Sequence, residues 1–377
     1  MTPKTQLRLY AVIVLTAVMV FLALPGRSEP VFAADEAKAM ALMECETGAL
    51  IAGKNADERL PMASTTKIMT ALVVLENCRT DEQVFVPDEA VGVEGSSIYL
   101  RNNERISVED LLYGLMLASG NDAAVALAVH VGGSTEGFAA LMNKRAEELG
   151  LENTHFVTPN GLNDPEHYTT ARELCMIARE AIKNDAFRQI VSTKYHRTQS
   201  GEYERTFKNK NSLLWSFDGA FGVKTGYTMA AGRCLVFGAE RDGMTLVGAL
   251  LNCRPMFGTA SELLETAFDT YEKTVVVEKD SVIMRAEVEN SDESVLEIAA
   301  KDSIIALLKK DAAQAFDVKT ELYGPTAAPI KAGQTLGRLR VFSSGELIGE
   351  TELVARADVR ERGITWWFWL LFKRMAA

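Results

Sequence analysis

The feature that most constrains the fold is a helix-forming stretch at residues 61–76 that has almost no polar face. It begins at a proline, which favours a turn, and seven of the eight residues after Lys67 are apolar. A helix that is apolar all round is buried inside a sizeable domain. Ser64 and Lys67 lie three residues apart at its start, so a helix places them on one face. They are either a capping serine with a solvated lysine or a nucleophile with its base, and burial of the helix favours the second interpretation.

The N-terminus has the pattern of a secretory signal peptide over residues 1–33. Lys4 and Arg8 precede an apolar run at 9–24, and Val31-Phe32-Ala33 offers small or apolar residues at the positions of a signal-peptidase site. The run is also about long enough for a retained membrane anchor, because ~20 apolar residues span a bilayer. Under either interpretation, the body of the protein lies outside the cytoplasm.

The rest of the chain is long enough for two domains, which usually contain about 100–200 residues each. The whole chain has a net charge of −11 and no basic stripe, so we expect no nucleic-acid partner. The five cysteines cannot all pair, and Cys234 with Cys253 is a disulfide candidate. The four histidines show no metal-ligand spacing, so we expect no metal and no other cofactor. These histidines are His130, His155, His167 and His196.

Two apolar helices are predicted to meet at a polar junction. Ser107 has the sequence context of a helix cap, and the first helix continues to Leu117. The second helix is predicted from Ala123 to His130. Ser119 and Asn121 lie between the two helices, where polar side chains can point into a cleft.

A third polar segment is predicted on or beside a β-strand. Lys224-Thr225-Gly226 precedes two alternating strands, 233–239 and 244–251, which the turn Asp242-Gly243 joins into a hairpin. Another short hairpin is predicted earlier in the chain, between residues 39 and 52. A helix from Ala260 to Glu272 follows.

The character of the sequence changes after about residue 274. Residues 275–360 contain short β-rich runs separated by turns, which indicates a smaller all-β domain. The segment 361–377 carries three tryptophans followed by Lys373-Arg374. Tryptophan favours the membrane interface and basic residues favour anionic lipid, so we predict an amphipathic helix lying in the membrane surface. The alternative is a helix docked on the protein itself.

Three polar motifs occur in the order typical of penicillin-recognising serine enzymes. They are Ser64-x-x-Lys67, Ser119-Gly120-Asn121 and Lys224-Thr225-Gly226.

Each motif suits a step of acyl transfer. Serine is a weak nucleophile, so Lys67 must be neutral to take its proton, and burial beside the Lys224 cation lowers the pKa of a lysine. Asn121 holds Lys67, and Ser119 relays a proton to the leaving amine. The backbone N–H groups of Ser64 and Tyr227 are candidates for the oxyanion hole. The substrate-binding set is Asn121, Lys224, Thr225, Gly226 and Tyr227.

The sequence resembles the low-molecular-mass penicillin-binding proteins of the D-alanyl-D-alanine carboxypeptidase family. Besides the three motifs, the similarity includes Asn160-Gly161-Leu162, residues 167–171 and residues 223–228. It implies a transpeptidase/β-lactamase-like α/β domain at 34–274, with an antiparallel sheet flanked by helices. A small all-β domain and an anchor helix follow. The implied substrate is a peptidoglycan stem peptide ending in D-Ala-D-Ala, and β-lactam antibiotics are the implied inhibitors.

One departure from the family concerns recognition of the substrate carboxylate. Many members carry an arginine shortly after the strand that follows Lys-Thr-Gly. Here the neighbourhood reads Asn252-Cys253-Arg254-Pro255, and we leave Arg254 out of the predicted site because it is displaced from the usual place.

Other activities use similar residues. Class A β-lactamases usually have aspartate where this chain has Gly120, and a Glu-x-x-Leu-Asn loop that the sequence after Glu166 lacks, so we expect Glu166 to be a surface residue. A D,D-endopeptidase or transpeptidase would use the same motifs. The non-enzymatic alternative is an inactive wall-binding scaffold held at the membrane.

Overall fold

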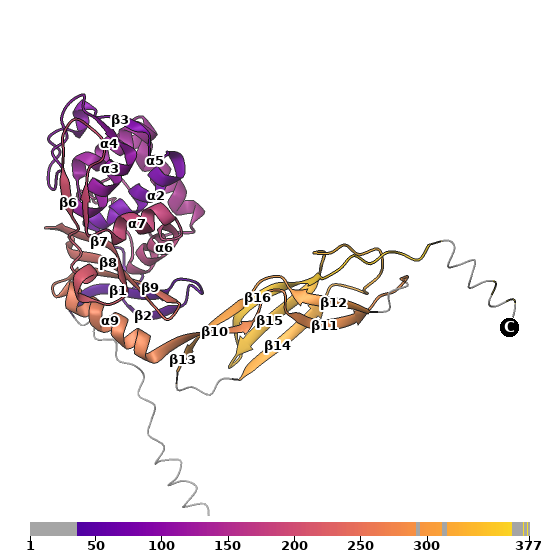
Figure 1. Cartoon of the computed structure of the whole chain (residues 1–377). Helices are drawn as coiled ribbons and strands as arrows, with labels where there is room; N and C mark the ends of the chain where they lie inside the picture. Colours follow the sequence, from indigo (N-terminus) through magenta and orange to yellow (C-terminus); the bar gives the residue numbers. More distant parts are fainter. Residues whose placement is uncertain (1–35, 292–294, 311–314, 364–371, 373–374, 376–377) are drawn as a thin grey trace, which may run out of the picture. The chain divides into compact units, whose positions relative to one another are not determined.

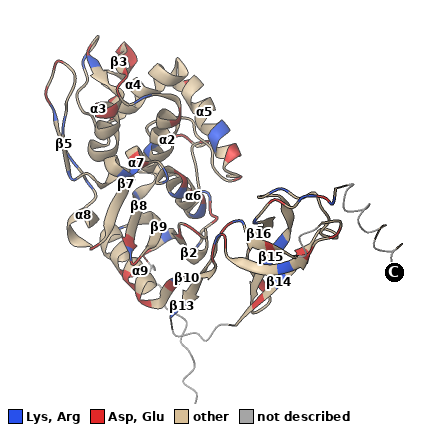
Figure 2. Cartoon of the chain, turned by 45° about the vertical axis from the view of Figure 1, so that its right-hand side comes forward, with Lys and Arg blue, Asp and Glu red and all other residues tan. Residues whose placement is uncertain are grey.

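The computed structural model of the chain describes residues 36–291, 295–310 and 315–363, together with Phe372 and Met375 (Figure 1). The predicted signal peptide and most of the predicted membrane-surface helix lie outside the described residues. Acidic and basic residues are interspersed along the described ribbon (Figure 2).

The predicted antiparallel sheet is confirmed. It has five strands in the order β2-β1-β9-β8-β7, and every neighbouring pair is antiparallel. Consecutive residues are buried along the middle of β8 and β9, so side chains on both faces are covered. Helix α6 (Ala171–Ala181) contacts β9 and β1, and helix α9 (Met256–Thr270) contacts β8 and β9. The strands are β1 (Ala37–Glu44), β2 (Leu50–Lys54), β7 (Ala220–Thr228), β8 (Gly232–Arg241) and β9 (Met244–Cys253).

The apolar stretch that begins at Lys67 forms helix α2 (Lys67–Asn77), and the first eight residues of this helix are all buried. It follows a single 3-10 turn, η1 (Ala63–Thr66). Helix α2 is the centre of the helical part, because it contacts β7 and, besides the preceding η1, five other helical elements. Those neighbours are η3 (Gly114–Ala118), α4 (Asn121–Gly132), α5 (Thr135–Glu148), α6 (Ala171–Ala181) and α7 (Asp185–Ser192).

Some predicted boundaries were wrong by a few residues. Helix α9 runs from Met256 to Thr270, so it begins four residues before the predicted Ala260, and strand β10 starts at Tyr271. Pro255 precedes its first turn, a place where the missing N–H of proline costs nothing. Helix α4 likewise begins at Asn121 itself, two residues before the predicted start.

The disulfide candidate was wrong. Cys234 and Cys253 are free cysteines. The hairpin register pairs Leu235 with Leu250, while Cys253 pairs with Ala37 on the other neighbour of β9. The two thiols therefore contact different groups, the carbonyl of Ala231 and the hydroxyl of Thr259.

The β-rich region after α9 is confirmed. Its main sheet has five antiparallel strands in the order β11-β12-β16-β15-β14 around a small apolar core, and β10 pairs with β13 in a separate ribbon. Almost all residues of strand β14 are exposed, and charged or polar residues interrupt its apolar pattern. The strands are β10 (Tyr271–Val277), β11 (Val282–Glu287), β12 (Val295–Ala300), β13 (Ile304–Lys309), β14 (Phe316–Leu322), β15 (Thr335–Ser343) and β16 (Glu346–Ala355).

Among the described helices, no single one is both long and apolar enough to cross a membrane. The pair α4 and α5 meets the length and composition requirement only when the two are joined across a bend of 81°.

Candidate active site

Ser64 lies in the 3-10 turn that leads into α2. Ala63 before it has a positive φ of 49°, which turns the chain sharply. The hydroxyl of Thr65 donates to the Met62 carbonyl at 2.6 Å, and that of Thr66 donates to the Ala63 carbonyl at 2.8 Å. These bonds fix the turn, so the half-buried Ser64 side chain is presented from a rigid support.

Lys67 is the first residue of α2 and is fully buried. Its Nζ lies 2.9 Å from Ser64 Oγ, 2.7 Å from Asn121 Oδ1 and 2.6 Å from the Asn160 carbonyl oxygen. Burial, followed by the positive charges of Lys224 and Lys210, holds the pKa of Lys67 well below its ordinary value. The alternative interpretation, in which Lys67 is a solvated lysine, was therefore wrong.

The junction between η3 and α4 places Asn121. Ser119 adopts a left-handed conformation with φ of 66°, which ends η3 and lets α4 begin in a new direction. The Asn121 side chain donates from Nδ2 to the Glu94 carbonyl at 2.5 Å, so its Oδ1 is turned towards Lys67. Gly95 is required there, because a Cβ on it would lie 2.7 Å from Asn121 Nδ2.

Strand β7 brings the third motif against the Ser64 turn. Lys224 is buried and donates from Nζ to the Thr225 carbonyl at 2.9 Å. Burial, with the nearby Lys210 cation, lowers the pKa of Lys224 to about 7. A Cβ on Gly226 would lie 3.1 Å from the backbone nitrogen of Ser64, so glycine permits the close approach of β7 to Ser64.

The predicted residues converge on one cavity of about 340 Å³. Five of the eight line it directly: Ser64, Ser119, Thr225, Gly226 and Tyr227. The other three are buried behind its wall, where Lys67 bonds Ser64 and Asn121, and where Lys224 acts on Lys67 through its charge. A larger cavity of about 600 Å³ shares only Lys210 with the first and contains none of the eight, so we place the reaction in the smaller one.

Sequence reasoning missed two groups that hold the Ser64–Lys67 pair. The Asn160 carbonyl binds Lys67, and Gly161 beside it packs so closely on Ala63 that a Cβ would lie 2.0 Å from the Ala63 oxygen. His167 is buried, and its Nδ1 accepts from the Val157 N–H at 3.0 Å. Its Nε2–H therefore donates to the Thr66 hydroxyl at 2.7 Å. Segments Asn160-Gly161-Leu162 and 167–171 belong to the family resemblance, and that resemblance was the sequence signal that could have pointed to these two groups.

The cavity also presents cations that the sequence did not assign. Lys210 and Arg233 line it, whereas Arg254 is exposed and is not among the lining residues. Lys210 Nζ donates to Ser96 Oγ at 3.2 Å, which keeps it at the cavity wall. The displaced position of Arg254 thus leaves Lys210 and Arg233 as the positive charges facing an anionic ligand.

The family model described as D-alanyl-D-alanine carboxypeptidase matches residues 27–254. The chain belongs to the D-alanyl-D-alanine carboxypeptidase family. A second model, the C-terminal domain of penicillin-binding protein 5, matches residues 271–361, which include all seven strands from β10 to β16. The chain is a serine-type D-alanyl-D-alanine carboxypeptidase.

Individual carboxypeptidases support the same assignment. D-alanyl-D-alanine carboxypeptidase DacF of Bacillus subtilis (strain 168) is 33% identical over 341 residues, which cover 88% of this chain and 87% of the relative. The crystal structure of penicillin-binding protein 5 from Haemophilus influenzae superposes with a TM-score of 0.76 at 29% identity, covering 89% of this chain and all of that one. A Streptomyces K15 structure described as a DD-transpeptidase has a TM-score of 0.59 at 40% identity, over 62% of this chain and 97% of its own.

The β-lactamase alternative loses its support. The matched families and relatives are carboxypeptidases, and Glu166 lies exposed in a loop, with its N–H bonded to the Asp164 carboxylate at 2.8 Å. The prediction that Glu166 is a surface residue is confirmed.

Proposed function

We propose that Ser64 is the acylated nucleophile of this carboxypeptidase and that neutral Lys67 is its base. The main support for this proposal is that Lys67 Nζ has three oxygen neighbours within hydrogen-bond distance. A neutral lysine amine has two N–H groups and one lone pair, one N–H fewer than the ammonium form. The Asn121 and Asn160 oxygens accept both N–H groups. The lone pair is left to accept the hydroxyl proton of the third neighbour, Ser64, whose Oγ lies 2.9 Å from Nζ.

The proposed substrate is a peptidoglycan stem peptide that ends in D-Ala-D-Ala. Its terminal carboxylate faces the Thr225 hydroxyl and the positive charge of Lys224, with Lys210 and Arg233 adding to the positive field of the cavity. This carboxylate places the last peptide bond over Ser64. β-Lactam antibiotics carry a carboxylate and a reactive amide in a similar arrangement, so we propose that they acylate the same serine.

The proposed reaction has two halves. Ser64 Oγ attacks the carbonyl of the penultimate D-alanine while its proton moves to Lys67. The N–H groups of Ser64 and Tyr227 stabilise the oxyanion, and Gly226 keeps their two chain segments in close approach. The C–N bond then breaks, and the proton passes through Ser119 to the leaving amine of D-alanine. Water attacks the acyl carbonyl and loses its proton to Lys67. The bond from that carbonyl carbon to Ser64 Oγ then breaks, Lys67 passes the proton to Oγ, and the shortened peptide leaves.

Product analysis on a muropeptide tests this assignment. We expect free D-alanine to appear at the rate at which the pentapeptide disappears, without cleavage or formation of cross-links. The alternative of a transpeptidase is motivated by the description of the Streptomyces K15 structure. Cross-linked dimers in the products would establish that alternative, and loss of existing dimers would establish an endopeptidase.

The Ser64→Ala variant separates the enzyme from a wall-binding scaffold. We expect it to release no D-alanine while keeping its fold, because Ser64 is half-buried and its removal leaves the Thr65 and Thr66 bonds of the turn intact. The matched control is Ser212→Ala in the neighbouring cavity, which we expect to retain the activity.

We also propose that the enzyme works on the outer face of the cytoplasmic membrane. Cleavage after residue 33 would release a mature chain with a catalytic domain at 34–274, a β domain at 275–360 and an anchor helix at 361–377. The tryptophans and Lys373-Arg374 of that last segment support an interfacial anchor. A chain ending at residue 360 should stay in solution when mixed with anionic vesicles that sediment the mature chain ending at residue 377. Equal sedimentation of both chains would contradict the proposed anchor.

A further inference from the structure

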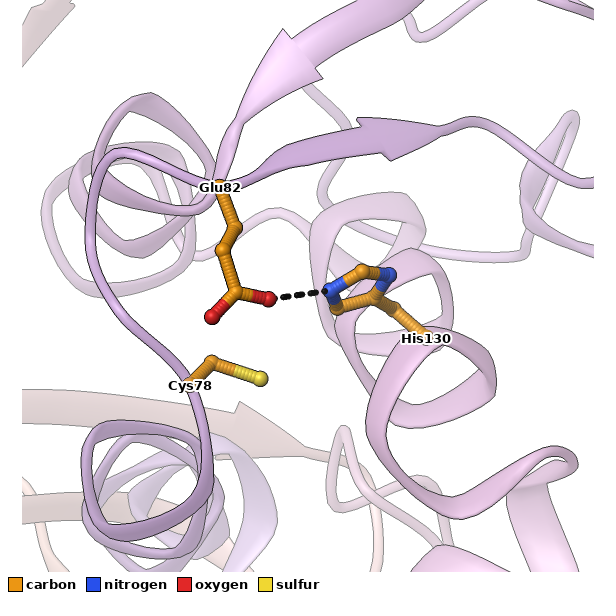
Figure 3. Close-up of side chains that lie close together, drawn as sticks. All are labelled: Cys78, Glu82 and His130. Atoms are coloured by element: carbon orange, nitrogen blue, oxygen red, sulfur yellow. Dashed lines mark hydrogen bonds and ion pairs between the residues drawn. The ribbon is translucent and has the colours of Figure 1, made fainter.

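Cys78, Glu82 and His130 form a compact cluster of three different metal-ligating groups (Figure 3). The thiol sulfur, a carboxylate oxygen and an imidazole nitrogen all lie within 4.8 Å of one another. His130 Nε2 and Glu82 Oε2 are 3.4 Å apart. The sequence showed no metal-like spacing because His130 is 48 residues from Glu82, and only the fold joins them.

Each ligand is held by ordered backbone. Cys78 caps the C-terminus of α2, with its N–H donating to the Val74 carbonyl at 2.9 Å. His130 lies in the last turn of α4. Glu82 precedes β3 (Gln83–Phe85), and its Oε1 accepts the Arg79 N–H at 2.8 Å, so the other oxygen is directed to His130.

The local charges favour a cation. The last carbonyl groups of a helix give its C-terminus a partial negative charge, and here the C-terminal turns of α2 and α4 converge on the carboxylate of Glu82. The Arg79 guanidinium binds both carboxylate oxygens of Asp81 instead, at 3.0 and 2.6 Å.

We propose that Cys78, Glu82 and His130 bind one Zn²⁺ ion, with water as the fourth ligand. Sulfur, nitrogen and oxygen donors together suit zinc, whereas magnesium and calcium prefer oxygen alone. Tetrahedral zinc with bonds of about 2.0–2.3 Å sets its ligands roughly 3.5 Å apart. The imidazole–carboxylate distance of 3.4 Å meets that value, and side-chain rotation brings the thiol within reach. On binding, the thiol proton passes to solvent and Cys78 binds as the thiolate.

The proposed site is separate from the catalytic centre and connected to it by two helices. Helix α2 begins at Lys67 and helix α4 begins at Asn121, two residues that are bonded to each other at 2.7 Å. With 11 and 12 residues, these helices are about 16 and 18 Å long. Zinc would join the same two helices at their opposite ends, so it acts as a structural link that fixes the helix pair carrying the catalytic base.

The test uses the whole mature chain without a histidine tag, freed of metal by dialysis against EDTA. Titration with Zn²⁺ should show one saturable site and raise the melting temperature. Titration with Co²⁺ should give the absorption of a tetrahedral site, with a charge-transfer band from one thiolate. We expect Cys78→Ser and His130→Gln each to weaken Zn²⁺ binding by more than about 100-fold, since loss of an outer-shell partner alone costs about 10–100-fold.

The matched control is Cys45→Ser, which removes a different half-buried free cysteine and should leave Zn²⁺ affinity unchanged. The rate of acylation by penicillin checks that each metal-free variant is folded. No saturable site, or equal Zn²⁺ affinity in Cys78→Ser, His130→Gln and the unaltered chain, would overturn the proposal. A cobalt complex without the thiolate band would also overturn it and would indicate an adventitious ion only.

Discussion

The Asn121→Asp substitution is a direct test of Lys67 as a neutral base. It places a carboxylate where Asn121 Oδ1 now lies, 2.7 Å from Lys67 Nζ. An opposite charge at such a distance raises the pKa of a lysine by about 1–3 units. A base must be neutral to act, so acylation falls as the pH drops below the pKa of Lys67. The acid limb of the pH–rate profile should therefore move upward by about 1–3 pH units, with a loss of roughly 10- to 1000-fold at a pH below the original pKa of Lys67.

The assay is the second-order rate of acylation by a chromogenic β-lactam, measured between about pH 5 and pH 9. Asn121→Ala is the control, because it removes the acceptor without adding charge. It leaves a buried N–H of Lys67 unpaired at a cost of about 1–3 kcal/mol, which lowers the rate by roughly 5- to 150-fold and leaves the limb near its original pH. An acid limb in Asn121→Asp at the same pH as in the unaltered enzyme would refute a neutral Lys67 as the base.

Three further predictions follow from the packing and charge around Ser64. Gly226→Ala should slow acylation by about 100-fold because its Cβ would press on the Ser64 backbone, whereas Gly258→Ala, with open space around it, should not; equal rates would contradict the close approach. Burial lowers the pKa of His167 from 6.5 to about 4, so the folded state binds fewer protons and roughly 2–4 kcal/mol of stability is lost as the pH falls from about 6.5 towards 4. Urea unfolding should show that loss in the unaltered chain and not in His167→Gln; the same loss in both would exclude His167 as its source. Lys210→Gln should raise KM for peptides with a free terminal carboxylate and also lower kcat below neutral pH, because the Lys210 charge helps to keep the pKa of Lys67 low; an unchanged KM would contradict a binding role.

Elements with strong local patterns were predictable from the sequence. The apolar run after Lys67 led to a buried α2, and the Asp242-Gly243 turn led to the hairpin of β8 and β9. The three motifs contain seven of the eight predicted residues that the fold brings together, and Tyr227 directly follows the third motif. The arrangement of the whole domain came from the family resemblance, because hydrophobic periodicity does not determine strand order.

The role of other parts of the site cannot be inferred from residue types and spacing in a single sequence. The Asn160 group that binds Lys67 is a backbone carbonyl, which any residue possesses. The replacement of Arg254 by Lys210 and Arg233 depends on where the chain passes in space. The cluster of Cys78 and His130 likewise exists only because two helices end side by side.

The most direct test of the account is peptide mapping by mass spectrometry after the enzyme has reacted with labelled penicillin. We predict one adduct per chain, on the peptide that contains Ser64, with no adduct in Ser64→Ala and very slow labelling in Lys67→Met. The Ser212→Ala control should label like the unaltered enzyme. Labelling on another peptide, or at full rate without Lys67, would contradict the assignment of nucleophile and base.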